Sequence, residues 1–498
     1  MSTYTAVSKL INSLSPSEKR LFRLSSRKHK SPSEYIGLFD LICRYNLQHT
    51  DHRAEIAKEF KIKFPESSID HTARYLIKLI TDLLIQAKVE KDSYFKMWYG
   101  LLRLKVLQER SLSEEGFREL KKIRDLAIRI QNYPALYIML RQELNFAFET
   151  NFSDITDSYI VETQMKAKET LRMMHYIEEH FALYELLRYR LIRLGKVESE
   201  ESKKKLNDLL LSEISIVTER TRNTFESRKL HILFQSFYFV GIGDFRSAID
   251  NFYDLNKLLE QHPHLQGHPP VDYFSSLDGI LDSLRSMHHF NEMPYYINKL
   301  RHITSYSLPE YFRVLIEKTI TVYSLAGLLG NNNIQGAINY IENLSASTLK
   351  SYQIVNDEKQ AELCFYCSLT YYYYKDYKKA HKYLSSVLNN YTNFSQQPIY
   401  KAIRLLNMLI HYLLKDTSFL DYDIRAYRRS LKNGGTSKIV KAIIKTLQHN
   451  PLLKTKYANQ AFARQIMPTI KNISKDRYER QILKYMDFTK WITEVLNV

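Results

Sequence analysis

Two cysteines three residues apart come nearest to a chemical motif in this chain. Cys364 and Cys367 form a Cys-x-x-Cys pair. Thiol redox sites that follow a strand use this spacing, as do zinc sites that have a second such pair. No strand pattern precedes the pair, and the third cysteine, Cys43, stands alone. We therefore expect both thiols to be core residues of a helix, in a protein from a reducing compartment.

Histidines between residues 261 and 270 form the second candidate pattern. His262, His264 and His268 have the character of metal ligands, but these ten residues also contain three prolines and no carboxylate. Such a composition is typical of a solvated loop. No glycine-rich phosphate loop, Ser-His-Asp arrangement or pair of catalytic carboxylates stands out elsewhere. We therefore expect a protein that is not an enzyme and has no metal and no cofactor.

Basic residues could bind phosphate, and their excess lies at the two ends of the chain. The formal net charge is +18. Residues 1–110 hold 20 Lys and Arg against 12 Asp and Glu, and residues 421–498 hold 16 against 6. Residues 111–420 are balanced, with 36 of each kind. Basic ends can attract nucleic acid, anionic lipid or acidic protein, although many basic proteins are merely soluble.

Two segments near these ends have features of nucleic-acid contact. Arg477, Arg480 and Lys484 share one face of a predicted helix and are candidate phosphate contacts. The alternative is a solvated face opposite the apolar stripe of Trp491. Residues 51–88 have the outline of a helix-turn-helix motif, but the predicted helix over 67–88 is long and apolar, unlike a recognition helix. We expect that segment to be a helical cap.

Helices are the elements that position all these residues. Only 13 Gly and 12 Pro are present, and alternating apolar runs are scarce, which favours an all-α chain. Ser and Glu spaced as helix caps predict helix starts near residues 16, 32, 112 and 308. Further helices are predicted over 93–110, 113–131, 134–150, 156–175, 180–194, 200–220 and 475–496, and Asn433-Gly434-Gly435-Thr436 marks the clearest boundary.

Four helix-turn-helix units in the second half of the chain repeat one turn pattern. A small or slim residue follows each turn, at positions 248, 293, 337 and 380, which are separated by 45, 44 and 43 residues. A period of this length predicts stacked helix pairs, none of which can bury its apolar face alone. The turns are Gly243-Asp244-Phe245-x-x-Ala248, His289-Phe290-x-x-Met293, Asn333-Ile334-x-x-Ala337 and Lys375-Asp376-Tyr377-x-x-Ala380.

Residues 361–390 resemble the tetratricopeptide repeat (TPR). The matching positions are Ser368 and Tyr371 in the first helix, Asp376-Tyr377 at the turn and Ala380 at the helix crossing. Residues 229–258 match through Ser236, Gly243, Asp244, Phe245 and Ala248. The period of about 44 departs from the usual 34, and Ile232 and Cys364 replace the usual Trp. The first 110 residues are similar to uncharacterised bacterial TPR-like proteins.

This resemblance implies a right-handed α-solenoid of antiparallel helix pairs with helical caps at both ends. We expect a basic helical domain over residues 1–110, a TPR-like array over 111–432, best defined over 225–432, and a basic helical cap over 433–498. TPR-like arrays bind extended peptides or helices along a concave wall. The resemblance places these residues on that wall: Phe234, Phe237, Asp278, Asp282, Arg285, Tyr323, Phe365, Tyr366, Tyr372 and Tyr373.

The leading hypothesis is a non-enzymatic scaffold that binds a protein or peptide through this wall. The alternative for the wall aromatics is burial against neighbouring repeats. The alternative function is nucleic-acid binding by the two basic ends. The chain has no apolar signal-peptide core and no apolar run near the ~18 residues of a membrane helix, so we expect a cytoplasmic protein with no membrane partner.

Overall fold

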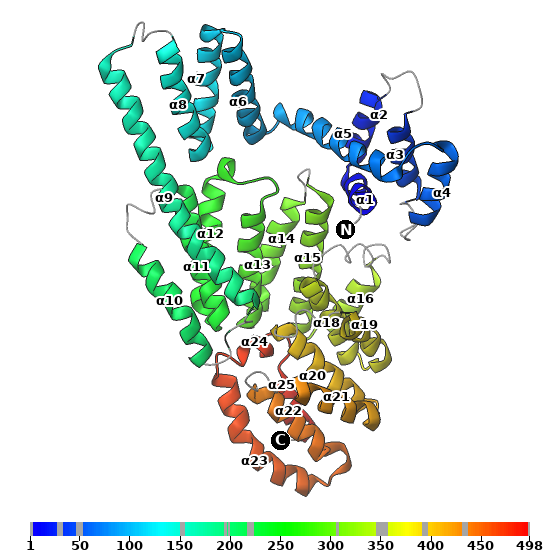
Figure 1. Ribbon diagram of the computed structural model, residues 1–498. Helices are drawn as coiled ribbons and strands as arrows, with labels where there is room; N and C mark the ends of the chain where they lie inside the picture. Colours follow the sequence, from blue (N-terminus) through cyan, green and yellow to red (C-terminus); the bar gives the residue numbers. More distant parts are fainter. Residues whose placement is uncertain are drawn as a thin grey trace. The chain divides into compact units, whose positions relative to one another are not determined.

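Every regular element in the described part of the chain is helical, with no strand, which confirms the all-α prediction. The computed structural model describes residues 3–26, 33–45, 53–149, 155–193, 197, 200–216, 224–304, 308–344, 357–390, 397–430 and 437–496. These residues form two compact units, one from residues 1–175 with 309–311, the other from 176–308 and 312–498 (Figure 1).

The first unit contains two small hydrophobic cores. One joins the first five helices and includes Phe22, Phe39, Phe60 and Leu76. The other joins the next three helices around Met97 and Phe146. The helices of this unit are α1 (Thr3–Ser13), α2 (Pro16–Ser26), α3 (Glu34–Tyr45), α4 (Arg53–Lys63), α5 (Ile69–Val89), α6 (Ser93–Glu109), α7 (Ser113–Arg129) and α8 (Tyr133–Glu149).

Local capping explains where α2 begins. The Ser15 backbone N–H donates to the Glu18 carboxylate at 2.8 Å, and the Glu18 N–H donates to the Ser15 hydroxyl at 3.3 Å. This reciprocal pair is the capping box that the sequence predicts. The predicted start near 112 is also confirmed, since α7 begins at Ser113. Ser31, Pro32, the Gly195 break, Ser307 and the boundary at 433–436 lie outside the described residues.

One prediction about helix boundaries was wrong in the middle of the chain. A single helix, α9 (Asp157–Arg193), replaces the two expected over 156–175 and 180–194 and continues from the first unit into the second. Residues 176–179 contain neither Gly nor Pro, so nothing local interrupts the helix.

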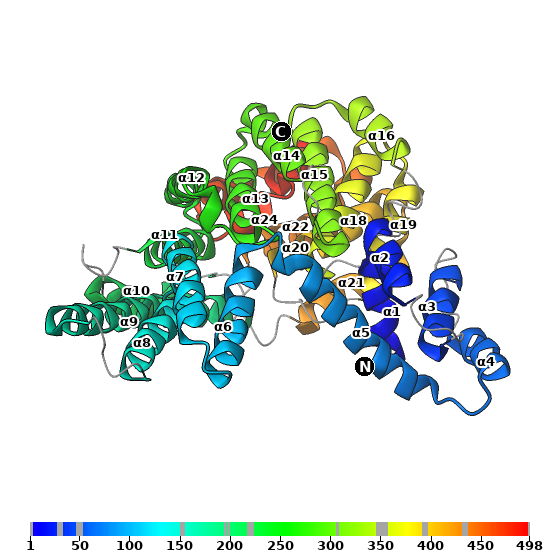
Figure 2. The same cartoon turned by 90° about the horizontal axis from the view of Figure 1, so that it is seen from above.

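The second unit is a succession of helices, several of which are joined in pairs by the short turns described below. The two helices of the pairs α11–α12, α13–α14, α18–α19 and α20–α21 pack against one another, and α12, α16 and α19 each pack against the helix that begins the next pair. Figure 2 shows α11 to α16 following one another in chain order. The helices of this unit are α10 (Glu200–Ile216), α11 (Phe225–Ile242), α12 (Phe245–Gln261), α13 (Val271–Ser286), α14 (Met293–Ile303), α15 (Glu310–Gly330), α16 (Ile334–Glu342), α18 (Asp357–Tyr373), α19 (Tyr377–Asn390), α20 (Pro398–Leu413), α21 (Thr417–Ser430), α22 (Lys438–His449), α23 (Lys456–Lys475), α24 (Arg480–Leu483) and α25 (Phe488–Leu496).

The four predicted turns lie where the pattern placed them and share one backbone geometry. In each, a residue with positive φ is followed by a residue whose N–H donates to the carbonyl five positions back, at 2.8–3.0 Å. The next helix then begins, and three of the four have an Asp or Asn side chain as cap. The same geometry recurs at three further turns. The positive-φ residues are Ser111, Gln131, Gly243, His288, Asn332, Lys375 and Lys415.

Ala248, Met293, Ala337 and Ala380 have equivalent surroundings in these turns. Each lies in the first turn of the second helix of its pair and has no exposed surface. A small or slender side chain here lets the two helices approach closely. The last predicted helix, over 475–496, was wrong as a single element: α23 ends at Lys475, and two short helices follow it.

Candidate functional site

Charged residues of α13 form the centre of a buried cluster in the second unit. Asp278, Asp282 and Arg285 are spaced four and three residues apart, so they lie on one face of that helix. Arg285 is only 1% exposed. A buried guanidinium is strongly unfavourable unless it is paired, and the surrounding helices supply its partners.

Arg285 is held by two carboxylates and three aromatic rings. Its Nη2 donates to Asp282 Oδ1 at 2.5 Å and to Glu362 Oε1 of α18 at 3.1 Å. The guanidinium carbon lies 4.8–5.7 Å from the ring centroids of Tyr323, Tyr366 and Tyr485, within cation–π range. Burial opposes the charge, but Tyr366 and the two carboxylates raise the pKa of Arg285 above its ordinary value.

Lys359 of α18 completes the ionic part of the cluster. Its Nζ donates to both carboxylate oxygens of Asp278, at 3.0 and 3.1 Å, and lies 3.5 Å from Glu362. The Tyr323 hydroxyl donates to Asp278 Oδ1 at 2.9 Å. Burial favours the neutral acid at Glu362, yet Lys359 and Arg285 lower its pKa to about 2. Glu362 is therefore charged, and Lys359 and Arg285 lie close enough to neutralise it.

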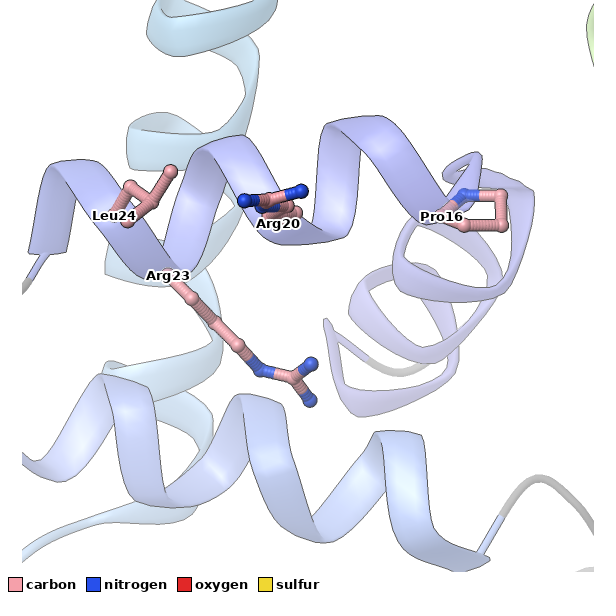
Figure 3. A pocket seen from close by; sticks show the side chains of 4 residues that line it. All are labelled: Pro16, Arg20, Arg23 and Leu24. Carbon is pink, nitrogen blue, oxygen red and sulfur yellow. The ribbon is translucent and has the colours of Figure 1, made fainter.

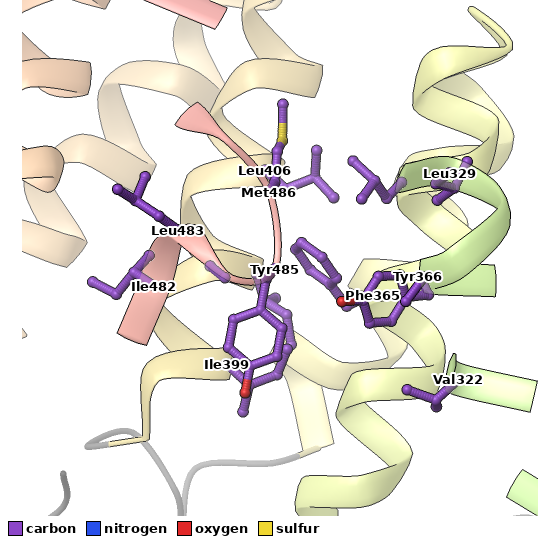
Figure 4. Packing of buried hydrophobic residues seen from close by; sticks show 14 of the residues in the cluster. Val322, Leu329, Phe365, Tyr366, Ile399, Leu406, Ile482, Leu483, Tyr485 and Met486 are labelled. Atoms are coloured by element: carbon purple, nitrogen blue, oxygen red, sulfur yellow. The ribbon is translucent and has the colours of Figure 1, made fainter. Parts of the chain in front are cut away.

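The chain's own C-terminal segment, residues 477–496, packs against this cluster. The Lys484 side chain is 1% exposed, and its Nζ donates to both carboxylate oxygens of Asp282 at 2.8 Å. The ring of Tyr485 lies 5.8 Å from that of Phe365. Figure 4 shows Tyr485 and Met486 among side chains of α18 and α20.

Further contacts extend this segment over several helix pairs. Gln481 donates to the Val240 carbonyl of α11 at 2.8 Å, and the Trp491 ring lies 6.3 Å from that of Tyr412 on α20. Together with Lys484 and Tyr485, these residues contact the first helices of four pairs: α11, α13, α18 and α20.

Glu479 anchors the start of the segment at the amino end of α22. Its carboxylate accepts hydrogen bonds from the Ser437 hydroxyl at 2.5 Å and from the N–H groups of Lys438 and Ile439 at 2.6 and 3.2 Å. A carboxylate here satisfies N–H groups left without partners at the helix end and complements the helix dipole. This anchor fixes the position from which residues 480–496 run across the other helices.

Lys318 of α15 is the cation of the cluster whose amine has no hydrogen-bond partner among the described residues. It has no exposed surface. Burial, and then the nearby charge of Lys359, lower the pKa of Lys318 to about 7. Asp278 and Glu362 act in the opposite direction without offsetting the burial. The amine is therefore a buried base that titrates near neutral pH.

The structure brings together most of the predicted wall residues. Asp278, Asp282, Arg285, Tyr323, Phe365 and Tyr366 all belong to or adjoin the cluster and are largely buried. Tyr372 lies at the end of α18 and is also buried, whereas Tyr373 beside it is 38% exposed. Burial, Glu494 and Asp487 raise the pKa of Tyr373 to about 12.

Two predicted wall residues face other helices. Phe234 belongs to a separate core with Leu187 and Leu209. The ring of Phe237 packs edge-on against Phe252, with the guanidinium of Arg188 4.3 Å from its centroid. Both lie at the junction of α9 and α10 with α11 and α12, away from the Arg285 cluster.

The candidate phosphate contacts do not form one surface stripe. Arg477 pairs with Glu200 and Tyr478, and Lys484 is buried on Asp282. Arg480 is exposed. The expected stripe depended on one continuous helix over 475–496, which the break after α23 removes.

Sequence reasoning missed Lys359, Glu362 and Lys318. Lys359 and Glu362 precede the apolar run of α18, where a charged pair three residues apart on an otherwise buried helix was the available signal. Lys318 gave a similar signal within α15. Lys484 was noticed, but as a surface cation.

The prediction that Cys364 and Cys367 are core residues of a helix is confirmed, because both are free, buried side chains of α18. Burial raises the pKa of both thiols, so neither is activated as a thiolate. Among the described residues, no three His, Cys, Asp or Glu side chains are grouped as a metal site.

A hollow of about 400 Å³ lies on α2 in the first unit, lined by Pro16, Arg20, Arg23 and Leu24 (Figure 3). Arg23 turns away from α2 to pair with Asp40 at 2.9 Å. Because all four lining residues come from a single helix, the hollow lacks the enclosing walls of a ligand site.

Comparison with family models, with curated proteins and with solved structures gives no match for this chain. None of the helices in the described ranges is long and apolar enough to span a bilayer.

Proposed function

We propose that the protein is a non-enzymatic helical-repeat scaffold that binds a protein or peptide partner. Residues 225–430 would form a TPR-like superhelical array, with the first helix of each pair on its inner wall. One observation supports this role above the others: the first helices of four pairs hold a polypeptide segment, residues 477–496, through specific side-chain contacts.

The wall is closed to a partner along most of this segment. Lys484, Tyr485, Phe488 and Ile492 are buried, so displacing them would expose a large apolar area together with the ionic cluster. A partner that bound the same position would have to offset this loss. We therefore place the partner beside the wall, at exposed side chains of the helices that pack against α20.

Four exposed aromatic side chains belong to the two segments that flank α20, and we call them the aromatic rim. Tyr373 and Tyr374 lie at the end of α18, and Phe419 and Tyr422 lie on α21. They are between 38% and 61% exposed. Both helices pack against α20, where the His411 ring stacks on Phe419 at 5.5 Å. Exposed aromatics on a rigid support are typical of binding hot spots.

Photo-crosslinking tests this proposal. We expect benzoylphenylalanine at position 374 or 419 to capture the same partner, because both positions belong to the rim. The matched control is position 189 on α9, where Tyr189 is 59% exposed. Tyr373→Ser should weaken capture at 419 by roughly tenfold, as expected for loss of a hot-spot contact. Identical products at all three positions, or none at 374 and 419, would exclude the rim as the binding surface.

A further inference from the structure

The turn between α22 and α23 exposes apolar and basic side chains side by side. Leu452 is 53% exposed, Leu453 78% and Tyr457 82%, and Lys454 and Lys456 between them are also exposed. We call Leu452–Tyr457 the 452–457 turn. Two adjacent leucines this exposed at the tip of a helical hairpin need an explanation, because apolar side chains exposed together, unlike single ones, mark interaction sites.

The backbone of this turn is firmly held. The Leu452 N–H donates to the Tyr412 hydroxyl of α20 at 3.0 Å. Asn459 donates to the Pro451 carbonyl at 2.9 Å and contacts His449 Nε2 at 3.0 Å. The His449 ring stacks on Phe462 with a centroid separation of 4.2 Å. The fold therefore fixes the turn and presents its leucines outward, so their exposure is not that of a loose loop.

The surrounding segment is strongly cationic. Residues 424–475 contain twelve Lys and Arg and no Asp or Glu. Five of these cations on the α22–α23 hairpin are exposed, and none has an ionic partner in the described part of the chain: Lys441, Lys445, Lys454, Lys456 and Arg464. Charge complementarity therefore indicates an anionic partner.

We propose that the 452–457 turn docks on an anionic lipid surface. Leu452 and Leu453 would enter the boundary between head groups and acyl chains, and Tyr457 would lie at the interface. Lys454, Lys456 and Lys445 would pair with lipid phosphates. This contact is peripheral, and it revises our expectation of no membrane partner, which rested on the lack of a spanning segment. It does not depend on the aromatic rim.

The leucine pair favours a lipid surface over nucleic acid. A nucleic acid would use the lysines, and a base could stack on Tyr457, but it offers nothing to two adjacent leucines. An anionic bilayer would interact with all three kinds of side chain, because it can bury the leucines, hold Tyr457 at its interface and pair with the lysines. Nucleic-acid binding is therefore the competing outcome of the test.

Vesicle co-sedimentation of the full chain tests the proposal. We expect binding to phosphatidylcholine vesicles that contain about one third phosphatidylglycerol, and little binding to phosphatidylcholine alone, because lysine contacts need anionic head groups. Leu452→Ser/Leu453→Ser should weaken binding about tenfold through lost apolar burial. Lys454→Glu/Lys456→Glu should weaken it more than about 25-fold, since each lysine contributes roughly fivefold.

The matched control is Leu211→Ser/Ile214→Ser on α10, where the two side chains are 68% and 61% exposed. It should bind vesicles like the wild type, and circular dichroism melting should show all variants folded. Absence of vesicle binding at low salt would overturn the proposal. Equal binding by the leucine variant and the wild type would overturn it too. So would tight binding of an oligothymidine in place of vesicles, which would assign the turn to nucleic acid.

Discussion

Lys318 is fully buried on α15, and its amine has no hydrogen-bond partner among the described residues. Its pKa is about 7 in the folded chain, against 10.5 for an ordinary lysine. As the pH falls, the amine therefore becomes protonated at a higher pH in the unfolded chain than in the folded chain. The folded state loses stability between pH 10.5 and 7, and the full penalty persists below pH 7.

Replacing this lysine should therefore stabilise the protein in a pH-dependent way. We expect Lys318→Met to raise the free energy of unfolding by roughly 2–4 kcal/mol at pH 6, because Met fills a similar volume without a charge. The gain should shrink as the pH rises from 7 towards 10. Urea denaturation at pH 6 and pH 9.5 measures both values. Lys257→Met, at an exposed position of α12, should show neither effect, and an equal gain at both pH values would contradict the assigned pKa.

At the scale of single elements, the repeated turn is the main device of the second unit. A positive-φ residue follows the first helix, and in five of the seven turns the next residue is an Asp or Asn whose side chain caps the second helix. Among the positive-φ residues of the seven turns, only Gly243 is a glycine. The other six are residues with side chains in the left-handed region, which is sterically unfavourable for them.

Lys375 gives a direct test of that strain. Its φ is 66°, and its side chain is exposed. We expect Lys375→Gly to stabilise the protein by about 0.5–1 kcal/mol, because glycine adopts this φ without a steric penalty. Thermal and urea denaturation would measure the change. Lys382→Gly, at an exposed interior position of α19 seven residues on, should instead destabilise by about 1 kcal/mol. Losses of equal size at both positions would contradict the turn geometry.

These turns also explain which elements could be predicted from the sequence. The turn dipeptide, its capping residue and the small residue four or five positions later are close together along the chain. A short stretch of sequence that includes Asp376 and Ala380 is therefore enough to predict the turn and the helix crossing. The long helix α9 was missed because a break was expected where no Gly or Pro is present.

Long-range contacts set the limit for the candidate site. The resemblance to the repeat grouped Asp278, Asp282 and Arg285, and the structure has them on one face of α13. Lys484, which pairs with Asp282, lies about 200 residues further along the chain. No periodicity in the sequence near α13 indicates a pairing over this distance. The sequence therefore predicts the charged face of α13 but not the segment that packs against it.

At the scale of the second unit, residues 477–496 connect helices from α11 to α20. Lys484 is central to this connection, since Asp282 would lose one of its two cationic partners without it. We expect Lys484→Ala to destabilise the unit by about 3 kcal/mol, as for a broken buried ion pair. Lys490→Ala, which removes an exposed pair with Glu494, should change stability by less than about 0.5 kcal/mol.

Hydrogen exchange distinguishes this connection from a purely local effect. In the Lys484→Ala variant, amides of α13 and α20 should lose protection together, because both helices pack against α24. Faster exchange confined to residues 477–496 would mean that the segment is an independent appendage.

The same segment has a consequence for synthesis on the ribosome. Gln481 and Lys484 are translated long after Val240 and Asp282, the residues they contact. While the chain is growing, residues 477–496 are not yet present to cover Arg285 and the aromatic rings around it. The helix pairs made earlier therefore stay incompletely packed until this segment is translated. A nascent chain arrested before residue 477 should therefore remain accessible to chaperones and proteases, even though most of its helices have already been made.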